Sequence, residues 1–100
     1  DTLYAGMPYG ASFACDPNHS PNHNDADQTI DAASHELMES VTDPLGNAWL
    51  DASGNEIGDK CIEQFGPRNS QGANVIWNSH PYLVQKEWDN VTGTCRMFRP

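Results

Sequence analysis

The sequence predicts an α+β fold in which one long helix packs on a small antiparallel β-sheet. Two observations indicate this class. Apolar residues recur at helical spacing between residues 24 and 42, and the last third of the chain consists of short β-branched and aromatic runs separated by turn-forming residues. A chain of 100 residues can bury only a modest core. We therefore expect a single domain over residues 1–100.

The first 24 residues are expected to contribute little regular structure. Residues 1–15 mix aromatic side chains with glycine and proline, which fits a strand with a bend. Residues 16–24 have the composition of a polar loop, and they include His19 and His23. These two imidazoles are candidate metal ligands, but solvated loop residues are the favoured interpretation.

The predicted helix has signals at both ends. Asn24 and Asp25 are candidate N-caps, and the segment Asp25–Gln28 fits a capping box. Pro44 disfavours helical conformation at the residue before it. We therefore expect the helix to end near Thr42.

One face of this helix is apolar. Its apolar residues follow one another at offsets of 3, 7 and 11 residues, and they are Ile30, Ala33, Leu37 and Val41. At about 100° per residue, this stripe lies almost opposite His35 and Glu39. We therefore expect the apolar stripe to pack on the core and the edge with His35 and Glu39 to face a cleft.

Residues 47–51 are predicted to form a short strand, and residues 52–55 a turn. Counted from Asp51, oxygen-bearing side chains fall at positions 1, 3, 5 and 9 of a calcium-binding loop. However, Glu56 stands where such a loop needs glycine, and Ile62 stands where it needs glutamate. A hairpin turn is therefore the favoured interpretation of this stretch.

The C-terminal third is predicted to form a meander of three short strands, over residues 75–77, 82–88 and 94–98. Cys61 and Cys95 are expected to form a disulfide that ties the middle of the chain to the last strand. Cys15 would then pair with a cysteine upstream of Asp1 or in another chain. The alternative is a cytosolic protein with three buried thiols.

The charge balance excludes some partners. The chain has 14 acidic residues against 5 basic ones, which gives a net charge of −9. A protein this acidic is poorly suited to nucleic acid or to an anionic membrane surface. No apolar run approaches 18 residues, so we expect no membrane-spanning segment.

The most informative stretch is His35–Glu39, which reads H-E-x-x-E. It differs at one position from the H-E-x-x-H motif of zinc peptidases. In a helix, His35 and Glu39 lie one turn apart on the same face and could hold one metal ion. Glu36 would lie beside that ion, where a general base is needed. The alternative is a solvated, charged helix face.

Several blocks of the sequence, taken together, resemble a known family. The blocks are Ser34–Pro44, Asn47–Asp51, Glu56–Cys61, Tyr82–Trp88 and Cys95. This pattern resembles secreted bacterial and fungal zincin-like metallopeptidases and, more distantly, the plant phosphate-induced, Exordium-type proteins. The resemblance covers residues 7–98 and implies a zincin-like fold and a secreted protein. Family members extend further upstream, so we expect this chain to be the C-terminal part of a larger processed protein.

A catalytic zinc site needs a third protein ligand. Asp59, in a turn-rich stretch after the helix, is the preferred candidate. Its rivals are Glu56, Glu63, His80 and a residue upstream of this chain. Asp43 lies about 12 Å from His35 along the helix axis, so we expect it to cap or brace the following loop instead.

The predicted function is therefore that of a secreted zinc-dependent metallopeptidase. Glu36 would take a proton from the attacking water and pass it to the leaving amine. Ligand oxygens from two carboxylates also admit manganese or calcium as alternatives to zinc. A protein or peptide substrate is expected, with an upstream segment or a second chain of the same precursor as a further partner. The alternative is a non-enzymatic secreted structural, cell-wall or assembly protein on a degenerate zincin scaffold.

Overall fold

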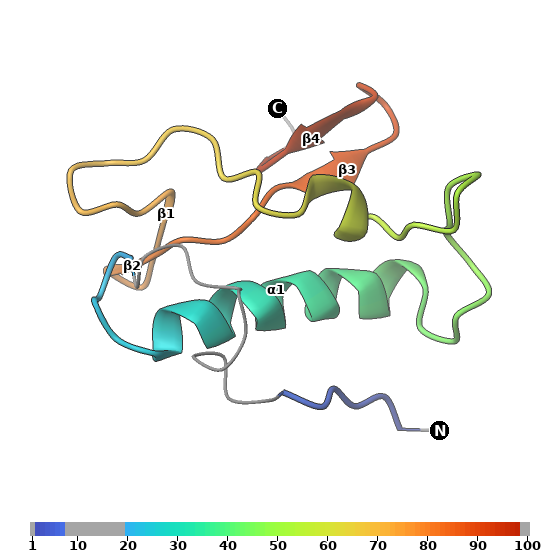
Figure 1. Cartoon of the computed structure of the whole chain (residues 1–100), viewed down its shortest axis with the longest axis horizontal. Coiled ribbons are helices and arrows are strands. Elements are labelled where there is room, and N and C mark those ends of the chain that lie inside the picture. The colour runs from blue at the N-terminus through green and yellow to red at the C-terminus, as the bar shows by residue number, and fades with distance from the viewer. Residues whose placement is uncertain (1, 8–19, 99–100) are drawn as a thin grey trace.

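Within the described residues, one α-helix, one short 3₁₀ helix and two β-hairpins make up the regular structure (Figure 1). The computed structural model describes residues 2–7 and 20–98. The elements, in chain order, are α1 (Ala26–Thr42), the short 3₁₀ helix η2 (Asp59–Cys61), β1 (Val75–Trp77), β2 (His80–Tyr82), β3 (Glu87–Asp89) and β4 (Thr94–Arg96). The α+β class is confirmed, but the expected single sheet is replaced by two antiparallel pairs, β1–β2 and β3–β4.

The ends of α1 follow the local sequence. The helix ends at Thr42, as the proline two residues later predicts. Asp25 occupies the N-cap position, but its side chain makes no capping hydrogen bond, so the predicted capping box is not formed. The first turn is held instead by Asn24 Oδ1, which accepts from Ala26 N at 3.0 Å. Asn22 adds two hydrogen bonds to the Asp27 carboxylate, at 2.9 and 2.8 Å.

The packing predicted for the apolar stripe of α1 is wrong. The apolar stripe faces outward: Leu37 is 63% exposed and Val41 is 69% exposed, whereas Asp31 and Glu39 are each 8% exposed. In Figure 1, η2 and the β3–β4 hairpin lie on one side of α1, and residues 2–7 run along the other side. The buried segment between β2 and β3 offers a hydrogen-bond donor to α1, since Gln85 N donates to Asp31 Oδ1 at 2.7 Å, and it covers the polar face of the helix.

The segment between β2 and β3 passes next to α1 without pairing as a strand. Here the predicted meander is wrong, because side chains take the hydrogen bonds that a neighbouring strand would make. Asn74 Oδ1 accepts from Val84 N at 3.1 Å, and Asn74 Nδ2 donates to Val84 O at 2.6 Å. Asp31 Oδ1 accepts from Gln85 N at 2.7 Å. These bonds satisfy a buried backbone that lacks a sheet partner.

Residues 43–58 form a succession of turns, and the strand predicted over residues 47–51 is absent from it. The turn over residues 52–55 is confirmed, with Gly54 N donating to Asp51 O at 3.0 Å. The Asp51 carboxylate accepts hydrogen bonds from Ser53 N and Asn55 N, and it pairs with Lys60 Nζ at 2.9 Å. Protein donors thus surround this carboxylate, which agrees with the turn rather than a calcium loop.

The hydrophobic core is small. Its buried members among the described residues are Ile57, Cys61, Ala73, Val75, Leu83 and Val84. The predicted disulfide between Cys61 and Cys95 is confirmed, with a Cα–Cα distance of 5.8 Å. It joins η2 to β4. Cys15 and His19 lie outside the described residues.

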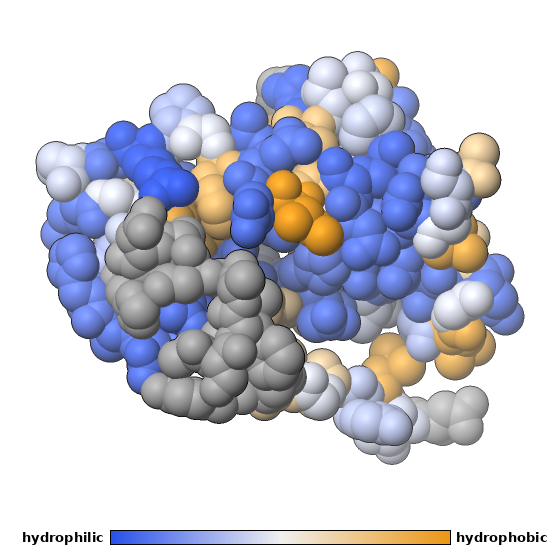
Figure 2. Space-filling view, viewed as in Figure 1, coloured by the Kyte–Doolittle hydropathy of each residue, from blue (hydrophilic) through white to orange (hydrophobic). Residues whose placement is uncertain are grey.

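The visible surface is largely hydrophilic (Figure 2). Hydrophobic side chains occur on it in separate places, one of them at the lower right, where residues 2–7 run beside α1. Within the described ranges, no helix is long and apolar enough to cross a membrane.

Candidate metal centre

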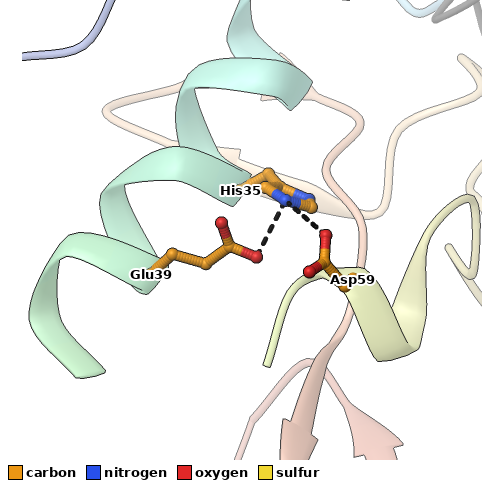
Figure 3. A group of neighbouring side chains, drawn as sticks. All are labelled: His35, Glu39 and Asp59. Carbon is orange, nitrogen blue, oxygen red and sulfur yellow. Dashed lines mark ion pairs between the residues drawn. The ribbon is translucent and has the colours of Figure 1, made fainter. Parts of the chain in front are cut away.

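Three side chains from two helices point toward one another (Figure 3). His35 and Glu39 stand one turn apart on α1, and Asp59 is the first residue of η2. His35 Nε2 lies 2.9 Å from Glu39 Oε1 and 3.6 Å from Asp59 Oδ1. One ligand atom from each of the three residues lies within 4.8 Å of the other two, so the group could hold a metal ion.

Asp59 is held in place by its own loop. Its Oδ2 accepts a hydrogen bond from Glu56 N at 3.1 Å, which leaves Oδ1 directed toward His35. The loop is fixed to the rest of the fold by Trp88 N, which donates to Ile57 O at 3.1 Å, and by the Cys61 disulfide. Asp59, the third member of the group, is therefore anchored on both sides along the chain.

Gly58 allows the two helices to approach this closely. A Cβ atom at this position would lie 2.9 Å from Glu39 Oε1 and from both Cε1 and Nδ1 of His35. Real Cβ atoms essentially never show contacts this short. The absence of a side chain at residue 58 thus brings Asp59 within reach of the helix.

Glu39 is the most constrained member of the group. It is 8% exposed, and its Oε1 is buried and has no hydrogen-bond partner among the described residues. This oxygen lies 2.9 Å from His35 Nε2, but the pair does not have hydrogen-bond geometry. A buried carboxylate oxygen without a hydrogen-bond donor is unfavourable in a protein. A cation between the imidazole nitrogen and this oxygen would satisfy both atoms.

The electrostatics of the group also favour a cation. The pKa of Glu39 is raised to about 7. Burial is the largest cause, the neighbouring carboxylates of Asp59 and Glu56 act in the same direction, and His35 acts against them. Burial lowers the pKa of His35, but a hydrogen bond with Gln85 and the nearby carboxylates, Glu39 first among them, raise it by more. Negative charge is thus in excess around His35, and a divalent ion would offset it.

Glu36, the predicted general base, is exposed and borders two cavities. The larger, of about 550 Å³, is also lined by Glu39 and by apolar side chains from both α1 and residues 2–7, including Leu37 and Leu3. The smaller, of about 270 Å³, is also lined by His35. Glu36 therefore has open space on both sides in which a substrate could lie near the group of three.

The other ligand candidates among the described residues do not belong to the group of three. Glu56 borders the larger cavity. Burial and the nearby Asp43 carboxylate raise the pKa of Glu56, and an interaction with the Glu39 side chain opposes them. Glu63 is exposed at the smaller cavity, and His80 is exposed in β2. Asp43 braces the following loop, as predicted: its Oδ1 accepts from Ala48 N at 2.6 Å. His23 is exposed in the loop before α1.

Sequence reasoning missed two residues of the site, Gly58 and Gln85. Gln85 is 5% exposed, and its Nε2 donates to Gly58 O at 2.9 Å. Neither residue has a motif of its own. Only the proximity of Gly58 to Asp59 in the sequence could have drawn attention to it.

No protein-family model, curated protein or solved structure matches this chain.

Proposed function

We propose that this protein is a zinc-dependent metallopeptidase-like hydrolase, with His35, Glu39 and Asp59 as metal ligands and Glu36 as general base. One observation carries the proposal: His35 Nε2 and two carboxylate oxygens, one of them buried and without a donor, converge on one point beside cavities that Glu36 borders. The Cys61–Cys95 disulfide supports a secreted location, because disulfides persist in oxidising compartments.

The donor set fits zinc. Ligand atoms about 2.1 Å from a tetrahedral zinc ion lie roughly 3.4 Å from one another. The distances from His35 Nε2 to the oxygens of Glu39 and Asp59, 2.9 and 3.6 Å, lie on either side of this value. One imidazole and two carboxylates together offset the charge of a divalent ion. Zinc is the first choice, and manganese and calcium are the alternatives because two of the three ligand atoms are oxygens.

In the proposed peptide hydrolysis, the metal ion, Glu36 and the cavity walls would have separate roles. A bound zinc ion would act as a Lewis acid, polarising the scissile carbonyl and making the attacking water more acidic. Glu36 would accept the proton of that water and then pass it to the leaving amine. The apolar walls of the larger cavity would pack against apolar side chains of the peptide.

Metal content is the first test. The purified protein should bind one equivalent of zinc, measured by elemental analysis after dialysis. His35→Ala or Glu39→Ala should abolish tight binding, because each removes one of only three protein ligands. His80→Ala, which changes an exposed histidine in β2, is the matched control and should keep full occupancy. Full occupancy in the His35 or Glu39 variant would rule out the ligand assignment.

The catalytic role is tested separately. Glu36→Gln keeps the size of the side chain but removes the base, so peptidase activity should fall by at least about 10²-fold while zinc content stays unchanged. Gln71→Ala, at an exposed residue that lines neither cavity, is the control and should remain active. Wild-type activity on a broad peptide library should vanish with a chelator. A protein that holds zinc but cleaves nothing would favour the non-enzymatic alternative.

A further inference from the structure

The Gln85 side chain lies where three parts of the chain meet. Its backbone N donates to Asp31 Oδ1 on α1 at 2.7 Å, and its Nε2 donates to Gly58 O at 2.9 Å. Gly58 precedes Asp59, the first residue of η2. Gln85 is therefore hydrogen-bonded both to the helix that carries His35 and to the loop that carries Asp59, and it is 95% buried between them, with 5% of its surface exposed.

The same side chain lies beside the His35 imidazole. His35 Nε2 is turned toward Glu39 and Asp59, while Nδ1 lies on the side of Gly58, where a Cβ atom would be 2.9 Å from it. The Gln85 amide donates to this same glycine, and Gln85 and His35 line the same small cavity. Gln85 Nε2 donates to Gly58 O at 2.9 Å and to Lys86 O at 3.4 Å, so Oε1 is the Gln85 atom that remains to accept a hydrogen bond from Nδ1–H.

We propose that Gln85 is the positioning residue of the metal centre. Its Oε1 accepts the Nδ1–H of His35, which leaves the Nε2 lone pair free for a metal, and its Nε2 fixes the peptide that presents Asp59. A ligating histidine usually donates its second ring N–H to a fixed acceptor, which sets both tautomer and ring orientation. One neutral amide thus sets the separation of ligands on two different helices. The role in metal binding rests on the proposed function, whereas the hydrogen bond itself does not.

Two substitutions separate the two hydrogen bonds. Gln85→Met keeps the approximate shape and removes both, so zinc affinity should fall by about 10- to 100-fold, the usual effect of losing such a partner. Gln85→Glu keeps an acceptor for Nδ1–H and loses the donor to Gly58 O, so it should recover part of that loss. Gln71→Met is the control. Gln71 is an exposed glutamine in the loop before β1, so this variant should bind zinc like the wild type.

A spectroscopic measurement reports the hydrogen bond directly and needs no metal. In proton–nitrogen correlation spectra of the metal-free protein, His35 should show an Nδ1–H signal that exchanges slowly with water. Comparison with His35→Gln assigns this signal. It should disappear in Gln85→Met and persist in Gln85→Glu and Gln71→Met.

The outcomes distinguish the two proposals. If the wild type binds no zinc but shows the protected Nδ1–H signal and loses it in Gln85→Met, the metal function fails and the positioning contact stands. If the wild type shows no protected Nδ1–H signal, the positioning role is wrong, whether or not zinc binds. The same conclusion follows if Gln85→Met binds zinc as tightly as the wild type.

Discussion

The clearest constraint at a single residue is the space around Gly58. Its φ of −72° and ψ of −43° suit any amino acid, so the backbone itself would accept alanine. The obstacle is the added methyl group, which would lie 2.9 Å from His35 Nδ1 and from Glu39 Oε1. The effect of a substitution here should therefore appear in the metal centre before it appears in the fold.

We predict that Gly58→Ala lowers zinc affinity by at least about 10-fold, because it displaces the imidazole and the carboxylate that we propose as metal ligands. Competition titration with a chromophoric chelator measures this change. Gly6→Ala is the matched control, since a Cβ atom there would meet nothing within 4 Å. Equal zinc affinity in the two variants would show that the close approach at Gly58 is irrelevant to the site.

Asp51 gives a pH-dependent prediction. Hydrogen bonds from Asn55 N and an ion pair with Lys60 hold the pKa of Asp51 well below its usual value. A depressed folded-state pKa means that the stabilisation is present above the unfolded-state pKa of about 3.9 and is lost as the pH falls through the folded-state pKa.

Asp51→Asn should therefore lower the Tm near about pH 6, and the difference in Tm between the variant and the wild type should narrow below about pH 4. Thermal unfolding followed by circular dichroism measures the Tm of both proteins at each pH. A difference that stays constant with pH would exclude the ionised carboxylate as its source.

Part of the candidate site could be predicted from the sequence. Helical periodicity predicts that His35 and Glu39 lie on one face, and in the structure His35 Nε2 lies 2.9 Å from Glu39 Oε1. Asp59 could be preferred but not singled out, because Glu56 and Glu63 occur in the same turn-rich stretch. Gln85 could not be found, since its importance comes from contacts with residues far away in the sequence.

At the level of elements, α1 shows what an apolar stripe does and does not determine. The pattern correctly predicted a helix and its end at Thr42. It did not determine which face the rest of the chain would cover. That choice follows from partners such as Gln85 N, which donates to the buried Asp31 carboxylate, and the sequence pattern of the helix contains no information about them.

Matched alanine substitutions on opposite faces of α1 test this orientation. Asp31→Ala should cost about 1–3 kcal/mol of unfolding free energy, because it leaves the buried N–H of Gln85 without an acceptor. Leu37→Ala should change stability by less than about 0.5 kcal/mol, because the side chain is already exposed. Urea unfolding measures both values. A loss of about 2–5 kcal/mol in Leu37→Ala would instead indicate a core position.

The strand predicted over residues 82–88 shows the same difficulty in a β segment. Its composition is typical of a strand, and its two ends do belong to β2 and β3. Between them, the side chains of Asn74 and Asp31 take the backbone hydrogen bonds of Val84 and Gln85. Strand propensity describes a side chain on a pleated surface and cannot anticipate such side-chain partners.

At the scale of the whole molecule, the small core of the described residues is supplemented by the Cys61–Cys95 disulfide. The disulfide closes a loop of 34 residues. Replacing both cysteines, as Cys61→Ser with Cys95→Ser, should lower the free energy of unfolding by about 3–4 kcal/mol, the chain-entropy value for a loop of this length. Urea unfolding of the double variant against the wild type measures the loss. An unchanged midpoint would show that the folded domain does not depend on the link.

The position of Cys61 adds a consequence for how the protein must be handled. Cys61 ends the three-residue helix that begins with Asp59, so the same short element carries a proposed ligand and the covalent anchor to β4. Cutting that anchor with a thiol reagent would leave the loop of Asp59 held by hydrogen bonds alone, from Trp88 N to Ile57 O and from Gln85 Nε2 to Gly58 O. The protein should then bind the proposed metal ion less tightly in a reducing medium than in an oxidising one. Zinc titrations made in dithiothreitol would describe a looser site than the oxidised protein has.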